Sequence, residues 1–224
     1  MKRDACYALL LVACHADAEP AVRDHRPTVE VVPIARDALC VTHGTIQGTR
    51  ISDPTVRAIA PLTSGTAGRL AFDALGRTTT ERDLASGQAR HQVGLKLRAQ
   101  DSCNVLYVMW RSDKPRLEVS LKLNAGSRTH AQCGAAGYTK LRGTTRPIPA
   151  LTGAHELRGE VVGNELTAWV DGQVAWRGTL PAEALALTGP SGFRTDNIEV
   201  ELAAFSAPLV AGAHAPCGRE ATTD

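Results

Sequence analysis

The sequence predicts an all-β protein, an antiparallel sandwich of two sheets, and three observations support this prediction. Apolar and polar residues alternate along short segments, whereas no apolar stripe with the helical period extends beyond two turns. Turn residues separate these segments, and the dipeptides Gly163-Asn164 and Asp171-Gly172 are strong hairpin signals, because tight hairpin turns need positive φ angles. The chain has 224 residues, 43% of them hydrophobic, which is enough for one large sandwich domain.

Three segments in the middle of the chain predict neighbouring strands. Gln92 to Ala99 alternates with apolar residues on one face, and Leu117 to Asn124 repeats the pattern. Between them, Val105 to Trp110 is apolar on both faces, which indicates a central strand covered on both sides or a face kept apolar for a ligand. The connection from Ser112 to Arg116 leaves the register between the last two strands open by one residue.

The C-terminal half predicts a three-stranded meander and a closing strand. Leu157 to Val162, Leu166 to Val170 and Val174 to Arg177 are joined by the two dipeptide turns. Ile198 to Phe205 alternates again and is expected to close the sandwich. Other expected elements are strands near Val56 to Ala60 and Leu70 to Ala74, and a loop or helical turn over Thr78 to Arg90.

The N-terminus has the form of an export signal. Two cations, Lys2 and Arg3, precede an apolar run from Ala5 to Ala13, which is too short to cross a bilayer core of about 30 Å. The tetrad Leu11-Val12-Ala13-Cys14 resembles the lipobox of bacterial lipoproteins, in which the cysteine is diacylated and becomes the new N-terminus. The resemblance implies membrane contact through a lipid anchor only, in the cell envelope, at the outer membrane or cell surface. Ordinary cleavage and secretion is the alternative.

These features divide the chain into four expected parts. Residues 1–13 form the lipoprotein signal peptide, and residues 14–35 form a tether, because that stretch mixes charged residues and proline without periodicity. Residues 36–207 form the β-sandwich domain, and residues 208–224 form an irregular C-terminal tail rich in alanine, glycine and proline.

The four cysteines that follow the lipobox predict two disulfides. An exported domain with an even number of cysteines favours disulfides, and the close spacings of a zinc site are absent from the sequence. Cys103 precedes one strand and Cys133 follows the strand that returns from it, so both are expected at the same end of a hairpin. By elimination, Cys40 pairs with Cys217 and joins the start of the domain to its end.

A series of turns and strands from Gln92 to Ala207 resembles a known fold family. It includes His155 to Val161, the two dipeptide turns, and Gly189 to Asn197 before the last strand. The series is similar to the C-terminal half of concanavalin A-like jelly rolls, among them laminin-G-like modules and keto-disaccharide hydrolase-like domains. The resemblance implies a jelly-roll sandwich that binds sugar on one sheet through aromatic rings and polar groups.

The first candidate binding site is a pair of tryptophans in one hairpin. If Asp171-Gly172 closes a two-residue turn, Trp169 pairs with Val174 and Thr167 with Trp176. Trp169 and Trp176 then lie diagonally on one face and form a platform for a sugar ring. The alternative is that this face is the core.

The second candidate site surrounds Glu118, the best candidate for a catalytic acid or base. Depending on the register, the neighbouring strand places either Trp110 or Tyr107 and Arg111 beside it. An acid beside an aromatic ring is typical of a sugar site, although isolated glutamates are also common on solvated strand faces. The resemblance to keto-disaccharide hydrolase-like domains maps their Asn, Arg and Glu onto Asn104, Arg111 and Glu118; their next Asp is replaced here by Asn124.

Composition excludes several function classes. Twenty-five Lys and Arg against 23 Asp and Glu leave no surplus of positive charge for a nucleic-acid backbone. The histidines lack metal-ligand spacing, and phosphate-loop and dinucleotide fingerprints are absent from the sequence, so no metal or other cofactor is expected. Structural calcium is common in jelly rolls, but no Asp-rich loop indicates it here.

The expected function is therefore non-catalytic binding of carbohydrate or cell-surface glycan by an exported, lipid-anchored sandwich. The first alternative is a glycan-active hydrolase or lyase that uses Glu118. The second is a structural envelope protein that binds another protein. The oligomeric state is left open.

Overall fold

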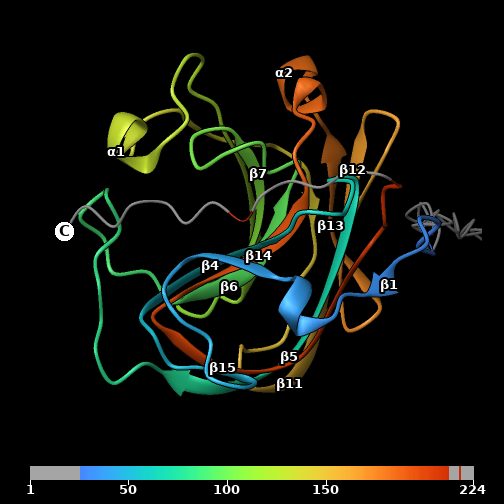
Figure 1. The fold of residues 1–224 in the computed structure, drawn as a ribbon. Coiled ribbons are helices and arrows are strands. Elements are labelled where there is room, and N and C mark those ends of the chain that lie inside the picture. Colours follow the sequence, from blue (N-terminus) through green and yellow to red (C-terminus); the bar gives the residue numbers. More distant parts are fainter. Residues whose placement is uncertain (1–25, 212–216, 218–224) are drawn as a thin grey trace, which may run out of the picture.

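The computed structural model describes residues 26–211 and Cys217, which form a sandwich of two antiparallel sheets (Figure 1). The predicted all-β jelly-roll class is confirmed. The eight-stranded sheet has the order β1 (Val32–Pro33), β15 (Ile198–Ala207), β5 (Ala67–Arg77), β11 (Gly153–Val162), β12 (Glu165–Val170), β13 (Gln173–Thr179) and β10 (Thr144–Thr145), with β3 (Arg50–Ile51) also paired to β15.

The seven-stranded sheet has the order β2 (Cys40–His43), β4 (Thr55–Ala60), β14 (Ser191–Asp196), β6 (Gln92–Leu97), β7 (Val105–Arg111), β8 (Arg116–Lys122) and β9 (Tyr138–Lys140). The helices are short: η1 (Arg36–Ala38), α1 (His130–Cys133) and α2 (Ala182–Ala186). Among the described residues, no helix has the length and apolar character needed to span a membrane.

The core lies between the sheets because alternate residues of each strand point inward. In β6, Val93, Leu95 and Leu97 are fully buried, as the alternation predicts. Trp110 of β7 contributes the largest fully buried side chain and packs edge-on against Phe72 of β5, with ring centroids 6.2 Å apart. The register therefore directs Trp110 into the core rather than toward Glu118.

The two hairpin turns form as predicted. Gly163 has a φ of 58°, and Asp171 and Gly172 have φ of 49° and 77°, so the tight turns do use positive φ angles. One detail of the second hairpin differs from the prediction: the register shifts between Ala168 and Trp169, so that Trp176 pairs with Ala168 instead of Thr167. This irregularity reverses the side-chain direction of Trp176 relative to the sequence expectation.

Both predicted disulfides are present. Cys103 and Cys133 join the start of β7 to α1, with their Cα atoms 5.9 Å apart. Cys40 and Cys217 join β2 to the C-terminal segment, with their Cα atoms 5.4 Å apart. The sandwich is thus closed covalently near its start and its end.

The described part of the expected tether packs on the eight-stranded sheet. Val32–Pro33 forms strand β1 beside β15. Upstream of it, the backbone N–H of Thr28 donates to Glu160 at 3.0 Å, and Arg158 donates to the carbonyl of Val29 at 2.5 Å. Arg158 and Glu160 alternate with inward-facing residues of β11, so the chain enters the domain across the outer face of this sheet. The signal peptide and Cys14 lie outside the described residues.

Candidate functional site

The best-formed pocket lies on the outer face of the seven-stranded sheet and has a cavity volume of about 290 Å³. Its floor comes from β4, β14, β6, β7 and β8, and its walls come from the loop over residues 78–90 and from the loop between β8 and β9. The lining residues are Arg57, Leu84, Ala85, Ser86, Arg90, Gln92, Ser102, Tyr107, Met109, Glu118, Ser120, Lys122, His130, Gly134, Ala135, Tyr138, Lys140 and Arg194.

One row of residues crosses five strands of this floor. Arg57 pairs with Arg194, Arg194 with Gly94, Gly94 with Met109, and Met109 with Glu118. Since neighbours in one row share a face of the sheet, the row has two arginines at one end and a carboxylate at the other. Gly94, which has no side chain, separates the two ends.

A buried ion pair fixes one of the two arginines. The Nε atom of Arg194 donates to Asp196 at 2.8 Å, and the amide of Gln92 donates to the same carboxylate at 2.7 Å. Burial alone would lower the pKa of Arg194, but Asp196 and the Tyr107 and Tyr138 side chains outweigh it and raise that pKa well above the ordinary value. Arg194 is therefore a permanently charged and internally neutralised group.

Its neighbour Arg57 lacks such a partner. Among the described residues, the Arg57 guanidinium has no carboxylate within ion-pair distance and no side-chain hydrogen bond. Burial, followed by repulsion from Arg194, lowers the pKa of Arg57.

Two tyrosines stack over the floor. Their rings, from Tyr107 and Tyr138, are nearly parallel, with centroids 6.0 Å apart. Tyr107 is 3% exposed and burial raises its pKa, whereas 45% of Tyr138 remains exposed at the pocket. For Tyr138, burial would raise the pKa, but the positive charges of Arg194 and Lys122 outweigh it and lower the pKa. Tyr138 is thus the more exposed of the two stacked rings and lines the pocket.

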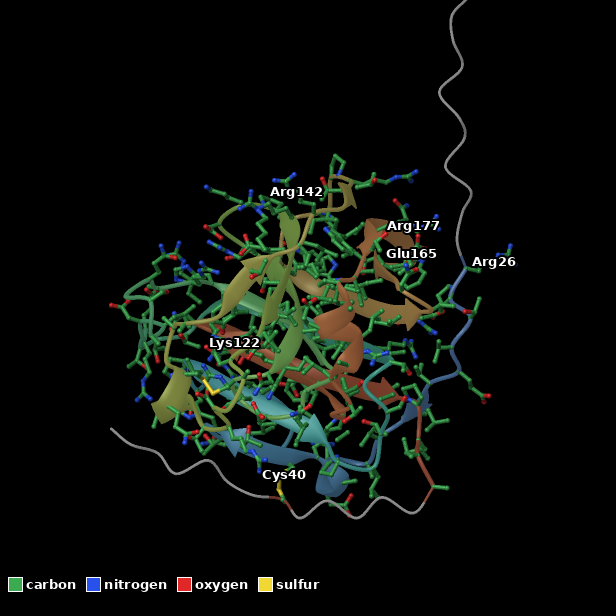
Figure 2. All side chains as sticks on the ribbon, turned by 90° about the horizontal axis from the view of Figure 1, so that it is seen from above. Arg26, Cys40, Lys122, Arg142, Glu165 and Arg177 are labelled. Atoms are coloured by element: carbon green, nitrogen blue, oxygen red, sulfur yellow. A yellow bond between two sulfur atoms is a disulfide. The ribbon has the colours of Figure 1, made fainter. Side chains whose placement is uncertain are left out.

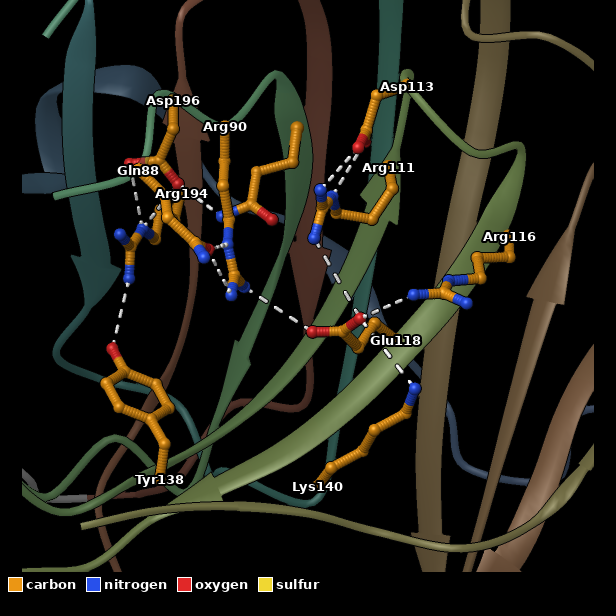
Figure 3. A network of polar contacts seen from close by, with 11 residues as sticks. Gln88, Arg90, Arg111, Asp113, Arg116, Glu118, Tyr138, Lys140, Arg194 and Asp196 are labelled. Carbon is orange, nitrogen blue, oxygen red and sulfur yellow. Dashed lines mark hydrogen bonds and ion pairs between the residues drawn. The ribbon is translucent and has the colours of Figure 1, made fainter. Parts of the chain in front are cut away.

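Glu118 is the centre of a cationic cluster at the other end of the row (Figure 3). Its carboxylate lies 3.4 Å from Arg90, 3.2 Å from Arg116 and 3.9 Å from both Arg111 and Lys140. Both carboxylate oxygens are thereby engaged by cations. Glu118 is also the only carboxylate among the described residues that line the pocket.

Specific contacts hold both walls in place. In the first wall, the Asn197 side chain accepts from the backbone N–H of Arg82 at 2.8 Å and donates to the carbonyl of Arg90 at 3.1 Å. In the second, Lys122 donates to the carbonyls of Ser102 at 3.2 Å and Gly134 at 2.9 Å, and the Cys103–Cys133 disulfide closes the same region. Figure 2 shows Lys122 inside the fold beside this loop.

The structure brings together three of the predicted site residues. Tyr107 and Glu118 line the pocket, and Arg111 contacts Glu118 while it donates to Asp113 at 2.6 Å. Met109 lies opposite Glu118, and this register settles the question that the sequence left open. Tyr107 and Arg111, and not Trp110, share a face of the sheet with Glu118. Asn104 lies apart from this pocket, because its amide is bound to Asp101 and to the carbonyl of Ser127.

The expectation of a tryptophan platform is wrong. Trp110, Trp169 and Trp176 are at most 3% exposed, so none of these rings is available for stacking on a sugar. Trp110 and Trp176 belong to the core, whereas Trp169 alternates with the core residues Ala168 and Val170 and so projects from the opposite face. The register shift before Trp169 is the physical reason why the two hairpin tryptophans do not share a face.

Sequence reasoning missed the residues that dominate the pocket, namely Arg57, Arg90, Lys122, Tyr138, Lys140 and Arg194. Arg57 interrupts an apolar strand at an outward position, and such an interruption was the one available signal. Tyr138 lies in a strand of three residues, which is too short for a periodicity signal. Within the described residues, no group of three or more His, Cys, Asp or Glu side chains is placed to hold a metal ion.

A comparison with protein-family models finds no match, and a comparison with curated proteins finds none either. Among solved structures, the carbohydrate-binding module CBM66 from Bacillus subtilis matches with a TM-score of 0.50 and 14% identity, over 77% of this chain and 93% of the module. The Crh5 transglycosylase in complex with NAG matches with a TM-score of 0.47 and 12% identity, over 81% and 83% of the two chains.

The galectin LEC-6 of Caenorhabditis elegans matches with a TM-score of 0.40 and 12% identity, over 78% of this chain and 97% of the galectin. At these identities the CBM66 match supports the fold alone. The chain therefore has a jelly-roll sandwich fold, as the module has.

Proposed function

We propose that the protein binds carbohydrate, without catalysis, in the pocket on the outer face of the seven-stranded sheet. The observation that carries this proposal is Tyr138, an aromatic ring that is 45% exposed at a pocket rich in hydrogen-bonding groups. Sugar sites combine an aromatic face for the apolar side of a pyranose with polar groups for its hydroxyls. At about 290 Å³, the cavity suits one sugar residue or the end of a chain.

We propose that the protein is not catalytic because too few carboxyl groups line the pocket. Glycoside hydrolysis by the common routes needs two carboxyl groups on either side of the scissile bond. Glu118 is the only carboxylate among the described lining residues, and cations engage both of its oxygens. We therefore expect bound glycan to remain intact. Product release that disappears in Glu118→Gln would instead support a hydrolase or lyase.

The test of binding is a glycan array followed by calorimetry on the tightest glycan. Tyr138→Ala should lower affinity about tenfold, or about 1.4 kcal/mol, because it removes the stacking surface. Tyr138→Phe is the matched control, since it keeps the ring, and should bind nearly as well as the wild type. Absence of any bound glycan at millimolar concentration would contradict the proposal.

We also propose that the protein is exported and held at the cell envelope by a lipid on Cys14. The tetrad Leu11-Val12-Ala13-Cys14 supports this proposal. Thr28 and Val29 lie across the outer face of the eight-stranded sheet, and the pocket opens on the opposite sheet, so these residues do not cover the pocket. Mass spectrometry should find diacylated Cys14 as the N-terminus, and Cys14→Ser should release the protein from membranes; an unmodified Cys14 would contradict the anchor.

A further inference from the structure

The charges that line the pocket are strongly unbalanced. Two arginines on the floor, one on a wall and two lysines stand against the single carboxylate of Glu118 among the described lining residues. The whole chain is nearly neutral, with a formal net charge of +2, so the surplus is a local property of this pocket. A local surplus of one sign in a cleft concentrates ligands of the opposite sign.

Most of these cations have partners within the protein. Arg194 is neutralised by Asp196, and Lys122 is bound to two backbone carbonyls and lies over the Tyr138 ring at 5.3 Å. Arg90 and Lys140 both contact Glu118. The remaining lining arginine is Arg57, which lacks a carboxylate partner among the described residues.

Arg57 is placed at a cost to the folded protein. It pairs directly with Arg194 across two antiparallel strands, and like charges in that position repel. Burial disfavours the charge of Arg57 as well, and the attraction of Asp196 is weaker than either of these two effects. Both effects disfavour a second arginine here, and an anion in the pocket would supply an ion-pair partner for it.

The chemistry of a guanidinium limits what that anion is. Its planar donors bind the two oxygens of a carboxylate or a sulfate in a bidentate manner. Arg57 and the exposed ring of Tyr138 both line the cavity, so one ligand can contact both. We infer that the pocket selects an acidic sugar, with Arg57 binding its carboxylate or sulfate group and Tyr138 stacking on its ring. This inference rests on the proposed carbohydrate binding.

Calorimetry on the full-length protein tests the inference with sugars that differ in charge. The uronate probes are oligogalacturonate and hyaluronan oligosaccharides, the sulfated probe is a chondroitin sulfate oligosaccharide, and the neutral probes are cello- and xylo-oligosaccharides of matched length. We expect an acidic probe to bind about tenfold more tightly than every neutral one, and more weakly as salt is raised. Comparison of the uronate probes with the sulfated probe shows whether the pocket binds a carboxylate or a sulfate group.

Arg57→Gln should abolish the preference for the acidic probe over the neutral ones, whereas Arg57→Lys should keep part of that preference. Arg36→Gln, at an exposed residue outside the pocket, is the matched control and should bind like the wild type. Thermal unfolding of Arg57→Gln should occur at the wild-type temperature or higher, because a repelled charge is removed; a lower value would indicate a structural role and overturn the inference.

The remaining outcomes separate the two proposals. Neutral sugars that bind as tightly as acidic ones, or a preference that survives Arg57→Gln, would overturn the inference and leave carbohydrate binding intact. Failure of every sugar to bind would overturn both. A single-stranded oligonucleotide that binds as tightly as the acidic sugar, and competes with it, would show a general polyanion site and overturn the selection of sugars.

Discussion

The outer faces of the two sheets both carry arginines, but they neutralise them differently. On the eight-stranded sheet each named arginine has its own carboxylate: the ion pairs are Arg69–Glu156 at 2.5 Å, Arg158–Glu160 at 3.3 Å, Arg177–Glu165 at 2.6 Å and Arg50–Glu199 at 2.7 Å. Figure 2 shows Arg177 and Glu165 side by side at the surface. On the seven-stranded sheet, Arg194 has Asp196 and Arg111 has Asp113, but four cations share Glu118, and among the described residues no carboxylate lies within ion-pair distance of Arg57.

This difference indicates that the two faces have different roles. The paired charges on the eight-stranded sheet neutralise one another. The same face also binds the N-terminal segment, because Thr28 donates a hydrogen bond to Glu160. Under the inference drawn above, a bound anion balances the surplus of positive charge on the seven-stranded sheet.

The largest expected effect is a loss of stability when the core between the sheets is changed, with no effect on binding at either outer face. Trp110→Ala should lower the free energy of unfolding by about 4 kcal/mol, because it empties the largest buried site. Denaturant unfolding followed by fluorescence measures this loss. Glycan affinity of the folded fraction should be unchanged; a variant that folds normally but loses glycan would return Trp110 to the binding site.

A smaller effect should follow removal of the disulfide beside the pocket. Cys103→Ser combined with Cys133→Ser should cost about 3 kcal/mol and also weaken glycan binding, because the bond closes a pocket wall. The pair Cys40→Ser and Cys217→Ser is the control, since that bond joins β2 to the C-terminal segment instead of closing a pocket wall, and its loss should cost stability alone. Unfolding and calorimetry on both variants give the comparison, which equal binding by the two would contradict.

The smallest effect concerns the eight-stranded sheet and depends on pH. Burial would raise the pKa of Glu160, but hydrogen bonds from Thr28 and Val29 outweigh it and lower the pKa below the ordinary value of 4.5. Its contribution to stability is thus present above pH 4.5 and lost as pH falls through the lowered pKa. Glu160→Gln should cost about 2 kcal/mol at neutral pH and progressively less below that window. Unfolding as a function of pH measures this, and a constant difference would contradict it.

The sequence predicted the framework better than the site, for a physical reason. Strand alternation and the turn at Asp171-Gly172 are local signals, and the Cys103–Cys133 pair followed from one hairpin. The site depends instead on register and on strands far apart in the chain: Arg57 and Arg194 meet only because β4 and β14 pair. The position of Trp176 could not be predicted, because a register shift leaves the pattern of residue types unchanged.

The most direct test of the asymmetry between the faces is an amide chemical-shift map of the labelled full-length protein titrated with oligogalacturonate. Shifts confined to the pocket, strongest around Arg57, Tyr138 and the loop over residues 78–90, are the predicted result. Shifts confined to the outer face of the eight-stranded sheet, around Arg158 and Glu160, would contradict the assignment of the ligand site to the seven-stranded sheet.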